Sequence, residues 1–297
     1  MRNLVQLLVN SLAAGGNYAL AAIGYALVYS ILKYVNFSHG SVAMVGAYLI
    51  LGLTSSWLKL NLIFAFVVSV LLSAFLGVII ERIAYRPLRQ RRVSTLAPLV
   101  TAVAVSFILE AVVTIVWGVD IRGYGLPVVR GWRVGPARVT TVQAIIIASG
   151  VSLMLCLHFL LTRTRLGKAI RAVSDNRELA QTLGLDVDKI ISSVFAIGSA
   201  LAAVAGGLVG LDTFVYPTMG FMITIKAFAA VALGGLGNVY GAIVGGFIIG
   251  LLENVGVWYV LGGDARWKES IAYAVLFLVL LLRPAGIFGS RQGTRVL

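Results

Sequence analysis

Long apolar stretches that carry almost no charge run through the whole chain, and they restrict its fold more than any other feature. An α-helix rises about 1.5 Å per residue, so about 20 apolar residues cross the hydrocarbon core of a bilayer. Hydrophobic residues make up 60% of the chain and charged residues only 12%, whereas soluble domains are about half apolar and a quarter charged. A transmembrane barrel would show alternating segments of about 10 residues instead. The sequence therefore predicts an all-α, polytopic integral membrane helix bundle.

We expect a single transmembrane domain over residues 1–297, with about eight transmembrane helices, some of them broken or re-entrant. The stretches 219–236 and 239–261 are separated by GGLGN at 234–238, so one of this pair is expected to be short or re-entrant. The candidate spans are residues 5–31, 38–56, 61–81, 96–118, 141–162, 190–211, 219–236, 239–261 and 269–284.

Basic residues gather between the apolar stretches and give the chain a formal net charge of +13. Lys and Arg of membrane proteins collect in short cytoplasmic loops, so this charge indicates orientation, and no nucleic-acid partner is expected. Segments 82–92 and 163–189 and the tail with Arg283, Arg291 and Arg295 are expected in the cytoplasm. Loop 119–140 is also basic, but one membrane span separates it from segment 82–92, so it is expected on the opposite, outer side of the membrane.

Neither histidine has companions at metal-binding spacing, so no metal site is expected.

One polar stretch, RAVSDNRELAQTLGLD at 171–186, stands apart from its apolar surroundings. Asp175 can cap the start of a short helix, with Glu178 three residues later as in a capping box. Gly184 occupies the position where helices commonly end in a left-handed residue. The helix would place Leu179, Ala180 and Leu183 on one face, with Arg177, Glu178 and Gln181 as a polar rim. So short a helix is marginal alone, which leaves two readings: an amphipathic connector on lipid or on the bundle, or a docking element for a soluble partner.

Several motifs carry a family resemblance. ELAQTLG (178–184) resembles the E-A-A-x-x-x-G signature of ABC importer permeases, with Leu179 departing from the middle Ala. Four longer segments resemble permease subunits of the branched-chain amino-acid ABC importers, of the H-type: VNFSHGSVAMVGAY (35–48), TRLGKAIRAVSDNRELAQTLGLD (164–186), LGGLGNVYGAIVGG (233–246) and LRPAGIFG (282–289). The resemblance extends through essentially the whole chain.

The resemblance implies a multi-pass permease of the bacterial cytoplasmic (inner) membrane that imports branched-chain or neutral amino acids by alternating access. The implied partners are a second, M-type permease, two ABC ATPase subunits, an extracytoplasmic substrate-binding protein and membrane lipid. The coupling residues that contact the ATPase would be Asp175, Arg177, Glu178, Ala180 and Gly184. The chain has no G-x-x-x-x-G-K-[ST] phosphate loop, so ATP and Mg²⁺ are expected on the partner ATPases. No residue of this chain is expected to be catalytic.

Two interruptions of the apolar runs and one charged residue are candidates for a substrate path. NFSHGS at 36–41 would let Ser38 cap a helix whose free amides attract an anion. GGLGN at 234–238 is the second break. The alternatives are an ordinary interfacial turn and tight helix packing. The candidate path residues are Asn36, Ser38, His39, Gly40, Glu110, Gly234, Gly235, Gly237 and Asn238. Lys226 could pair with Glu110, line a polar path with it, or extend to the membrane interface.

The substrate and the class of transporter leave alternatives open. A urea or short-amide ABC importer permease fits the same motifs, and no residue decides between these cargoes. A stand-alone secondary transporter explains the broken spans but leaves the docking helix without a role. An intramembrane hydrolase using Ser38 and His39 is disfavoured, because adjacent residues rarely activate one another and no G-x-S-x-G motif is present.

Overall fold

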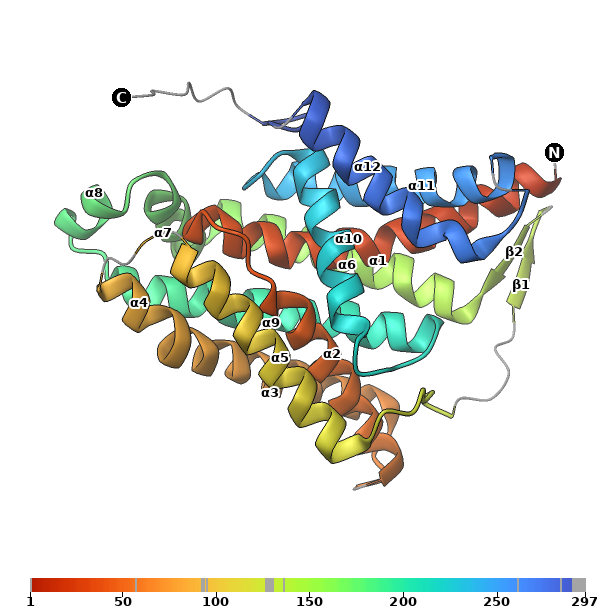
Figure 1. Cartoon of the computed structure of the whole chain (residues 1–297), viewed down its shortest axis with the longest axis horizontal. Helices are drawn as coiled ribbons and strands as arrows, with labels where there is room; N and C mark the ends of the chain where they lie inside the picture. Colours follow the sequence, from red (N-terminus) through yellow and green to blue (C-terminus); the bar gives the residue numbers. More distant parts are fainter. Residues whose placement is uncertain are drawn as a thin grey trace.

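Helices make up most of the chain in the computed structural model, which describes residues 2–56, 58–91, 94, 96–125, 131–135, 137–260, 262–283 and 285–289. Some of them run roughly along the long axis of the molecule and others cross it obliquely (Figure 1). The helices are α1 (Arg2–Leu32), α2 (Ser38–Leu51), α3 (Leu62–Ile80), α4 (Arg86–Gln90), α5 (Leu96–Trp117), α6 (Thr141–Arg163), α7 (Arg165–Asp175), α8 (Arg177–Thr182), α9 (Val187–Asp212), α10 (Met219–Gly234), α11 (Val239–Tyr259) and α12 (Lys268–Leu282). π-Helical turns continue α2 over Gly52–Ser56 and join α3 to α4 over Glu81–Tyr85.

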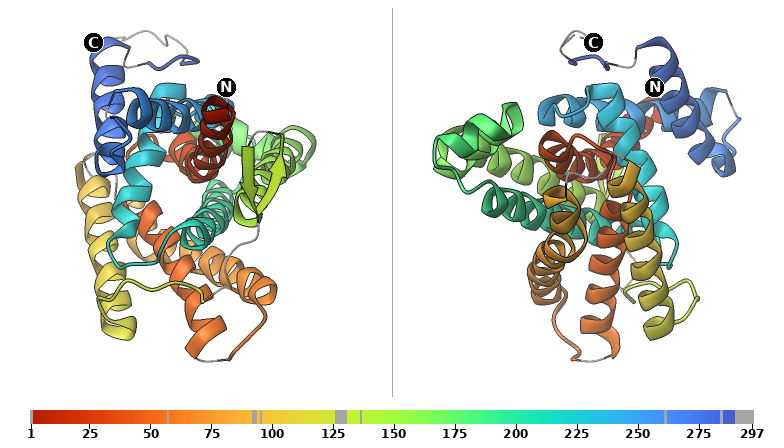
Figure 2. Two further views of the ribbon diagram at one scale, coloured as in Figure 1. Left: turned by 90° about the vertical axis from the view of Figure 1, so that its right-hand side faces the viewer. Right: turned by 60° about the vertical axis from the view of Figure 1, so that its left-hand side comes forward.

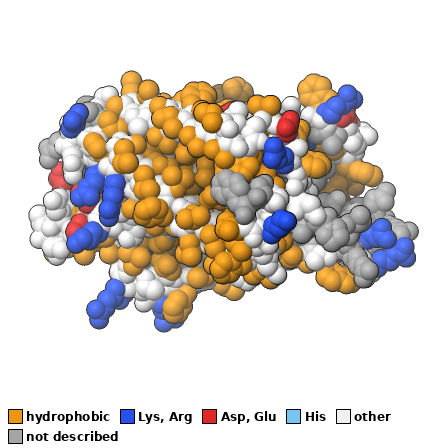
Figure 3. Space-filling model, turned by 90° about the horizontal axis from the view of Figure 1, so that it is seen from below, with side chains coloured by type: hydrophobic (Ala, Val, Ile, Leu, Met, Phe, Trp, Pro, Cys, Tyr) orange, Lys and Arg blue, Asp and Glu red, His pale blue; other side chains and the backbone are white. Residues whose placement is uncertain are grey.

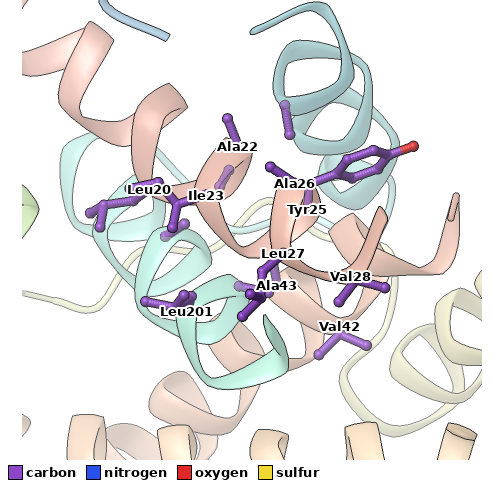
Figure 4. Close-up of a cluster of buried hydrophobic side chains, with 14 of the residues drawn as sticks. Leu20, Ala22, Ile23, Tyr25, Ala26, Leu27, Val28, Val42, Ala43 and Leu201 are labelled. Atoms are coloured by element: carbon purple, nitrogen blue, oxygen red, sulfur yellow. The ribbon is translucent and has the colours of Figure 1, made fainter. Parts of the chain in front are cut away.

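The first helix forms the centre of the bundle. The most apolar part of α1 is 83% buried, against 67% for α9 and 39% for α11, and α1 packs on α6, α9, α10 and α11. The end-on view in the left panel of Figure 2 shows α1 surrounded by these neighbours. Its side chains meet those of α2 and α9, as Leu27 meets Ala43 in the cluster of Figure 4. Small residues permit close packing on α1: a Cβ on Gly246 of α11 would lie 2.5 Å from the backbone nitrogen of Ala19.

The outer helices expose their apolar side chains, as a lipid-facing surface requires. The most apolar parts of α3, α5 and α6 are only 28%, 11% and 22% buried, and Phe75 of α3 and Ile115 of α5 are exposed. Figure 3 shows hydrophobic side chains over the middle of one face, whereas Lys and Arg lie toward both ends, including the end that holds α7 and α8. The prediction of an all-α polytopic membrane bundle is confirmed.

Six helices in the described ranges are long and apolar enough to cross a bilayer: α1, α3 extended by α4, α5, α6, α9 and α11. Helix α10 is also apolar but has 16 residues. One member of the pair on either side of GGLGN was expected to be short, and α10 confirms this.

The two basic internal segments lie at the same end of the bundle. Arg86 and Arg89 of α4 contact Asp188 at the start of α9, at 2.8 and 2.6 Å. A two-stranded antiparallel hairpin, β1 (Gly131–Val134) and β2 (Ala137–Thr140), lies at the opposite end. This arrangement agrees with the orientation expected from the loops. Residues 126–130 and 136 of loop 119–140, and the part of the tail that holds Arg291 and Arg295, lie outside the described residues.

Candidate functional site

The short helix expected in the polar stretch is present as α8, and its cap differs from the expected one. Asn176, in an extended conformation, is the N-cap: its Oδ1 accepts a hydrogen bond from the backbone N–H of Leu179 at 3.0 Å. Asp175 is the last residue of α7. The prediction that Asp175 caps the helix is therefore wrong by one residue, because α7 continues through Asp175 before the chain turns. Glu178 consequently lies one position too early for a capping box and is exposed.

The end of α8 is as expected. Gly184 has a φ of +83°. The N–H of Gly184 donates to the carbonyl of Gln181 at 3.0 Å, and the N–H of Leu185 donates to that of Ala180 at 3.1 Å. These two bonds form the Schellman arrangement that satisfies the last carbonyls of a helix. Both ends of α8 are therefore capped by residues that adjoin the helix in the sequence.

Two contacts hold the α7–α8 segment against the end of α1. The Arg177 guanidinium donates to the backbone carbonyl of Ile31, and the Ser174 hydroxyl donates to that of Ser30 at 2.9 Å. Ala180 is 2% exposed, whereas Leu179 and Leu183 are 57% and 73% exposed. The expectation that these three share one face is therefore wrong: Ala180 packs inward and the two leucines face outward beside Glu178.

A buried ion network beside α8 was not anticipated from the sequence. The Glu81 side chain is fully buried. Its Oε1 accepts from Arg89 at 2.9 Å, and its Oε2 accepts from the Ser192 hydroxyl of α9 at 2.7 Å. Arg89 also contacts Asp188. This network joins the α3–α4 segment to the start of α9. The only signal in the sequence was an acidic residue at the end of an apolar stretch, directly before Arg82.

The NFSHGS interruption is a buried turn whose amides already have partners. Asn36 Oδ1 accepts from the Ser38 N–H at 3.2 Å, from the Ser38 hydroxyl at 2.7 Å and from the Tyr85 hydroxyl at 2.8 Å. The Gly40 N–H donates to the Thr224 hydroxyl at 3.1 Å. The expectation that Ser38 caps α2 is therefore wrong. Ser38 is the first residue of α2, and both its N–H and its hydroxyl donate to the Asn36 side chain. The expected free amides are not free, and a substrate-path role for Asn36, Ser38, His39 and Gly40 stays a prediction.

The GGLGN turn joins α10 to α11 near the end of α1. Gly235 and Gly237 have φ values of +115° and +84°, and Asn238 caps α11 by accepting from the Gly241 N–H at 3.0 Å. Residues 287 and 288 donate their N–H groups to the carbonyls of Leu233 and Gly234 at 2.7 and 3.1 Å. The turn is therefore covered by the segment after α12. A path role for Gly234, Gly235, Gly237 and Asn238 also stays a prediction.

A cavity of about 510 Å³ opens toward the end of the bundle opposite α8. Four helices form it: α1, the end of α9, α10 and the start of α12, the last two of which pack together (Figure 2). Its lining combines small, apolar and charged side chains. These include Ala14, Asn17, Tyr18, Ala21, Val209, Asp212, Met219, Met222, Ile223, Lys226, Lys268 and Glu269.

A buried charge cluster lies beside this cavity. The Lys226 ammonium is 3.2 Å from Glu253 Oε1 of α11, without the geometry of a hydrogen bond, and it donates to the Tyr18 hydroxyl at 3.0 Å. That hydroxyl donates to Glu253 Oε2 at 2.5 Å. Lys268 lies 3.9 Å from the same oxygen. Glu253 is fully buried, and the Lys226 side chain is 15% exposed.

Lys226 therefore has a partner other than the one expected. The predicted pair with Glu110 is wrong because α10 packs on α11 and α1, which brings Glu253 to Lys226, and Lys226 does not extend to the interface. Glu110 is half-buried on α5, and no ion pair joins it to another residue in the described part of the chain. Its role on a path stays a prediction.

Comparisons with known proteins show similarity to branched-chain amino acid permeases over almost the full length of the chain. A family described as "Branched-chain amino acid transport system / permease component" matches residues 7–280. The high-affinity branched-chain amino acid transport system permease protein LivH of Salmonella typhimurium is 36% identical, over 98% of this chain and 97% of the relative. The high-affinity permease protein BraD of Pseudomonas aeruginosa is also 36% identical, over 98% of both. A probable branched-chain amino acid transport permease protein LivH of Methanocaldococcus jannaschii is 31% identical, over 91% of this chain and 88% of the relative.

Proposed function

Because the chain belongs to the branched-chain amino acid transport system permease family, we propose that it moves branched-chain amino acids inward as one of two permease subunits of an ABC importer. The chain is a multi-pass membrane transport subunit and not an enzyme. We place it in the bacterial cytoplasmic membrane beside a second, M-type permease. Two ATPase subunits bind ATP and Mg²⁺ on its cytoplasmic side, and a substrate-binding protein delivers the amino acid from outside.

The observation that carries this proposal is the form of α8. A helix capped at both ends presents Leu179, Leu183 and Glu178 outward at the basic end of the bundle. Exposed apolar side chains on a polar segment are typical of a surface that a partner covers. The ATPase subunit is the partner that an ABC permease requires on this side, and the two leucines would fill its groove.

Motion of α8 would reach the membrane helices along contacts described above. Arg177 and Ser174 join the α7–α8 segment to the end of α1, which is the central helix. Helix α9 begins five residues after α8 ends, and its Asp188 is held by Arg86 and Arg89. Closure of the ATPases would therefore shift α1 and α9 together, as alternating access requires.

The test uses the complete transporter in proteoliposomes with Leu183→Glu. A charge in an apolar groove is costly to bury, so we expect less co-purifying ATPase and a loss of ATP-driven leucine uptake. Val119→Glu makes a similar change at a residue that is equally exposed but lies at the other end, and it should leave both readouts unchanged. Normal uptake and assembly with Leu183→Glu would contradict docking through α8. Absence of leucine uptake by the unmodified complex, with uptake of urea in its place, would contradict the amino-acid assignment.

A further inference from the structure

The cavity between α1, α9, α10 and α12 contains a buried polar group without a protein partner. Asn17 lines this cavity and is 5% exposed. Its Oδ1 makes no hydrogen bond to any part of the chain that the structure describes. An unsatisfied buried amide oxygen costs about 1–3 kcal/mol. A ligand that supplies a hydrogen-bond donor at this position would remove that cost.

The charges around the cavity are unequal at its inner and outer parts. Inside, two ammonium groups, those of Lys226 and Lys268, lie within 4 Å of a single carboxylate, that of Glu253. This part therefore has an excess of positive charge and attracts a carboxylate. At the mouth, Asp212 and Glu269 expose two carboxylates, which attract an ammonium group. The Arg266 guanidinium also lines the mouth, but it is paired with Asp264 at 3.0 Å. A molecule that carries a carboxylate and an ammonium group close together is complementary to both parts of the cavity. A molecule with one of these groups is complementary to one part.

The rest of the lining suits a compact apolar side chain. Met219, Met222 and Ile223 come from successive turns of α10, and Val209 faces them from α9. Ala14 and Ala21 leave room along α1. Pockets for small ligands usually have volumes of about 300–1,000 Å³ with a few polar groups that fix orientation, and this cavity has 510 Å³.

We propose that this cavity binds the zwitterion of an apolar α-amino acid during transport. The ligand carboxylate lies with Lys226 and Lys268, and its ammonium group lies with Asn17 Oδ1 and Asp212. Its side chain packs on Met219, Met222 and Ile223. The assignment rests on the proposed function and adds to it a defined site within the membrane domain, at the end opposite the ATPases. Lys226 is the residue of this site that the sequence suggested for a polar path, whereas Asn36, Glu110 and the glycine turns lie outside it.

The experiment measures binding of labelled leucine to the complete permease–ATPase complex in nanodiscs, without the substrate-binding protein. We expect saturable binding that isoleucine and valine displace. Isoamylamine lacks the carboxylate and 4-methylpentanoate lacks the ammonium group, so each should compete at least tenfold more weakly. Displacement by 4-methylpentanoate as strong as by leucine would indicate a simple anion site and overturn the proposal.

Two variants remove the groups assigned to the two ligand charges. Asn17→Leu takes away the unpartnered oxygen without breaking a hydrogen bond of that oxygen, and Lys268→Met takes away the more exposed ammonium while Lys226 still pairs with Glu253. Each should lower leucine binding and maximal uptake at least tenfold, with unchanged complex assembly. Ser11→Ala is the matched control, because Ser11 is buried on the same helix, bonds only to its own helix backbone and lies outside the cavity.

The outcomes separate this site from the proposed function. If the unmodified complex takes up leucine but does not bind it without the substrate-binding protein, or if both variants transport at the normal rate, the cavity assignment is wrong and the importer function stands. If the unmodified complex with its binding protein does not take up leucine at all, the proposed function is wrong and the cavity assignment falls with it.

Discussion

The Glu253 carboxylate shows how single residues set the stability of this bundle. It is fully buried among three polar groups, the ammonium groups of Lys226 and Lys268 and the hydroxyl of Tyr18. A buried ion pair adds little net stability compared with well-packed apolar residues, but removal of one partner leaves an uncompensated charge. The effects of mutating Lys226 and Glu253 on stability should therefore not be additive.

A double-mutant cycle at this pair tests that argument. Lys226→Met leaves Glu253 with the Tyr18 hydroxyl and, as its charged partner, the more distant Lys268, and we expect a loss of about 3–5 kcal/mol in stability. The double variant K226M/E253Q removes both charges and should recover most of that loss. Thermal unfolding of the detergent-solubilised chain, followed by intrinsic fluorescence, measures the effect. The cycle is completed by Glu253→Gln, and a loss in the double variant equal to the sum of the losses in the two single variants would show that the two residues do not interact.

At the scale of one element, α8 depends on local hydrogen bonds more than on packing. It has six residues, which is too short for stability in isolation, and only Ala180 of its residues is buried. Its persistence therefore depends on the Asn176 cap, on the bonds at Gly184 and on the contact of Arg177 with α1.

Removal of the cap should loosen α8 alone. A cap-to-Ala change costs about 1 kcal/mol, so Asn176→Ala should speed hydrogen exchange of the amides over residues 178–182 by about fivefold. Asp175→Ala changes the neighbouring acidic residue, which does not cap α8, and should leave these amides unaffected. Hydrogen-exchange mass spectrometry of both variants decides which residue is the cap. Faster exchange in Asp175→Ala alone would reverse the assignment.

The same helix shows which features a sequence can predict. Capping residues and a left-handed glycine are local signals, so the existence of α8 and the role of Gly184 were predictable. The position of the cap was not, because Asp and Asn are equally good N-caps and the end of α7 decides between them. Charges within apolar runs indicated that Lys226 needs a partner. They could not identify Glu253, because that contact depends on which helices pack together.

At the scale of the whole molecule, the central helix α1 connects the α7–α8 segment at one end with the cavity at the other. Its last turn receives Arg177 and Ser174 from the α7–α8 segment, while Asn17, Tyr18 and the two alanines of its middle line the cavity. A buried helix that packs on α6, α9, α10 and α11 moves as a rigid element, since closely packed interiors do not deform continuously. Displacement of α8 could therefore change the shape of the cavity through α1.

Arg177→Met should break this connection without removing the docking surface. The hydrogen bond of a charged group is worth about 1.5–3 kcal/mol, and its loss frees α8 from α1 while Leu179 and Leu183 still face the ATPase. We expect the variant to assemble with its ATPases and to hydrolyse ATP, while leucine uptake per ATP falls about tenfold or more. Arg171→Met is the control, because Arg171 is an exposed basic residue of α7 that makes no hydrogen bond to α1 in the described chain. An unchanged ratio of uptake to hydrolysis in Arg177→Met would mean that force reaches the cavity by another route, through α9 and its contacts with Arg86 and Arg89.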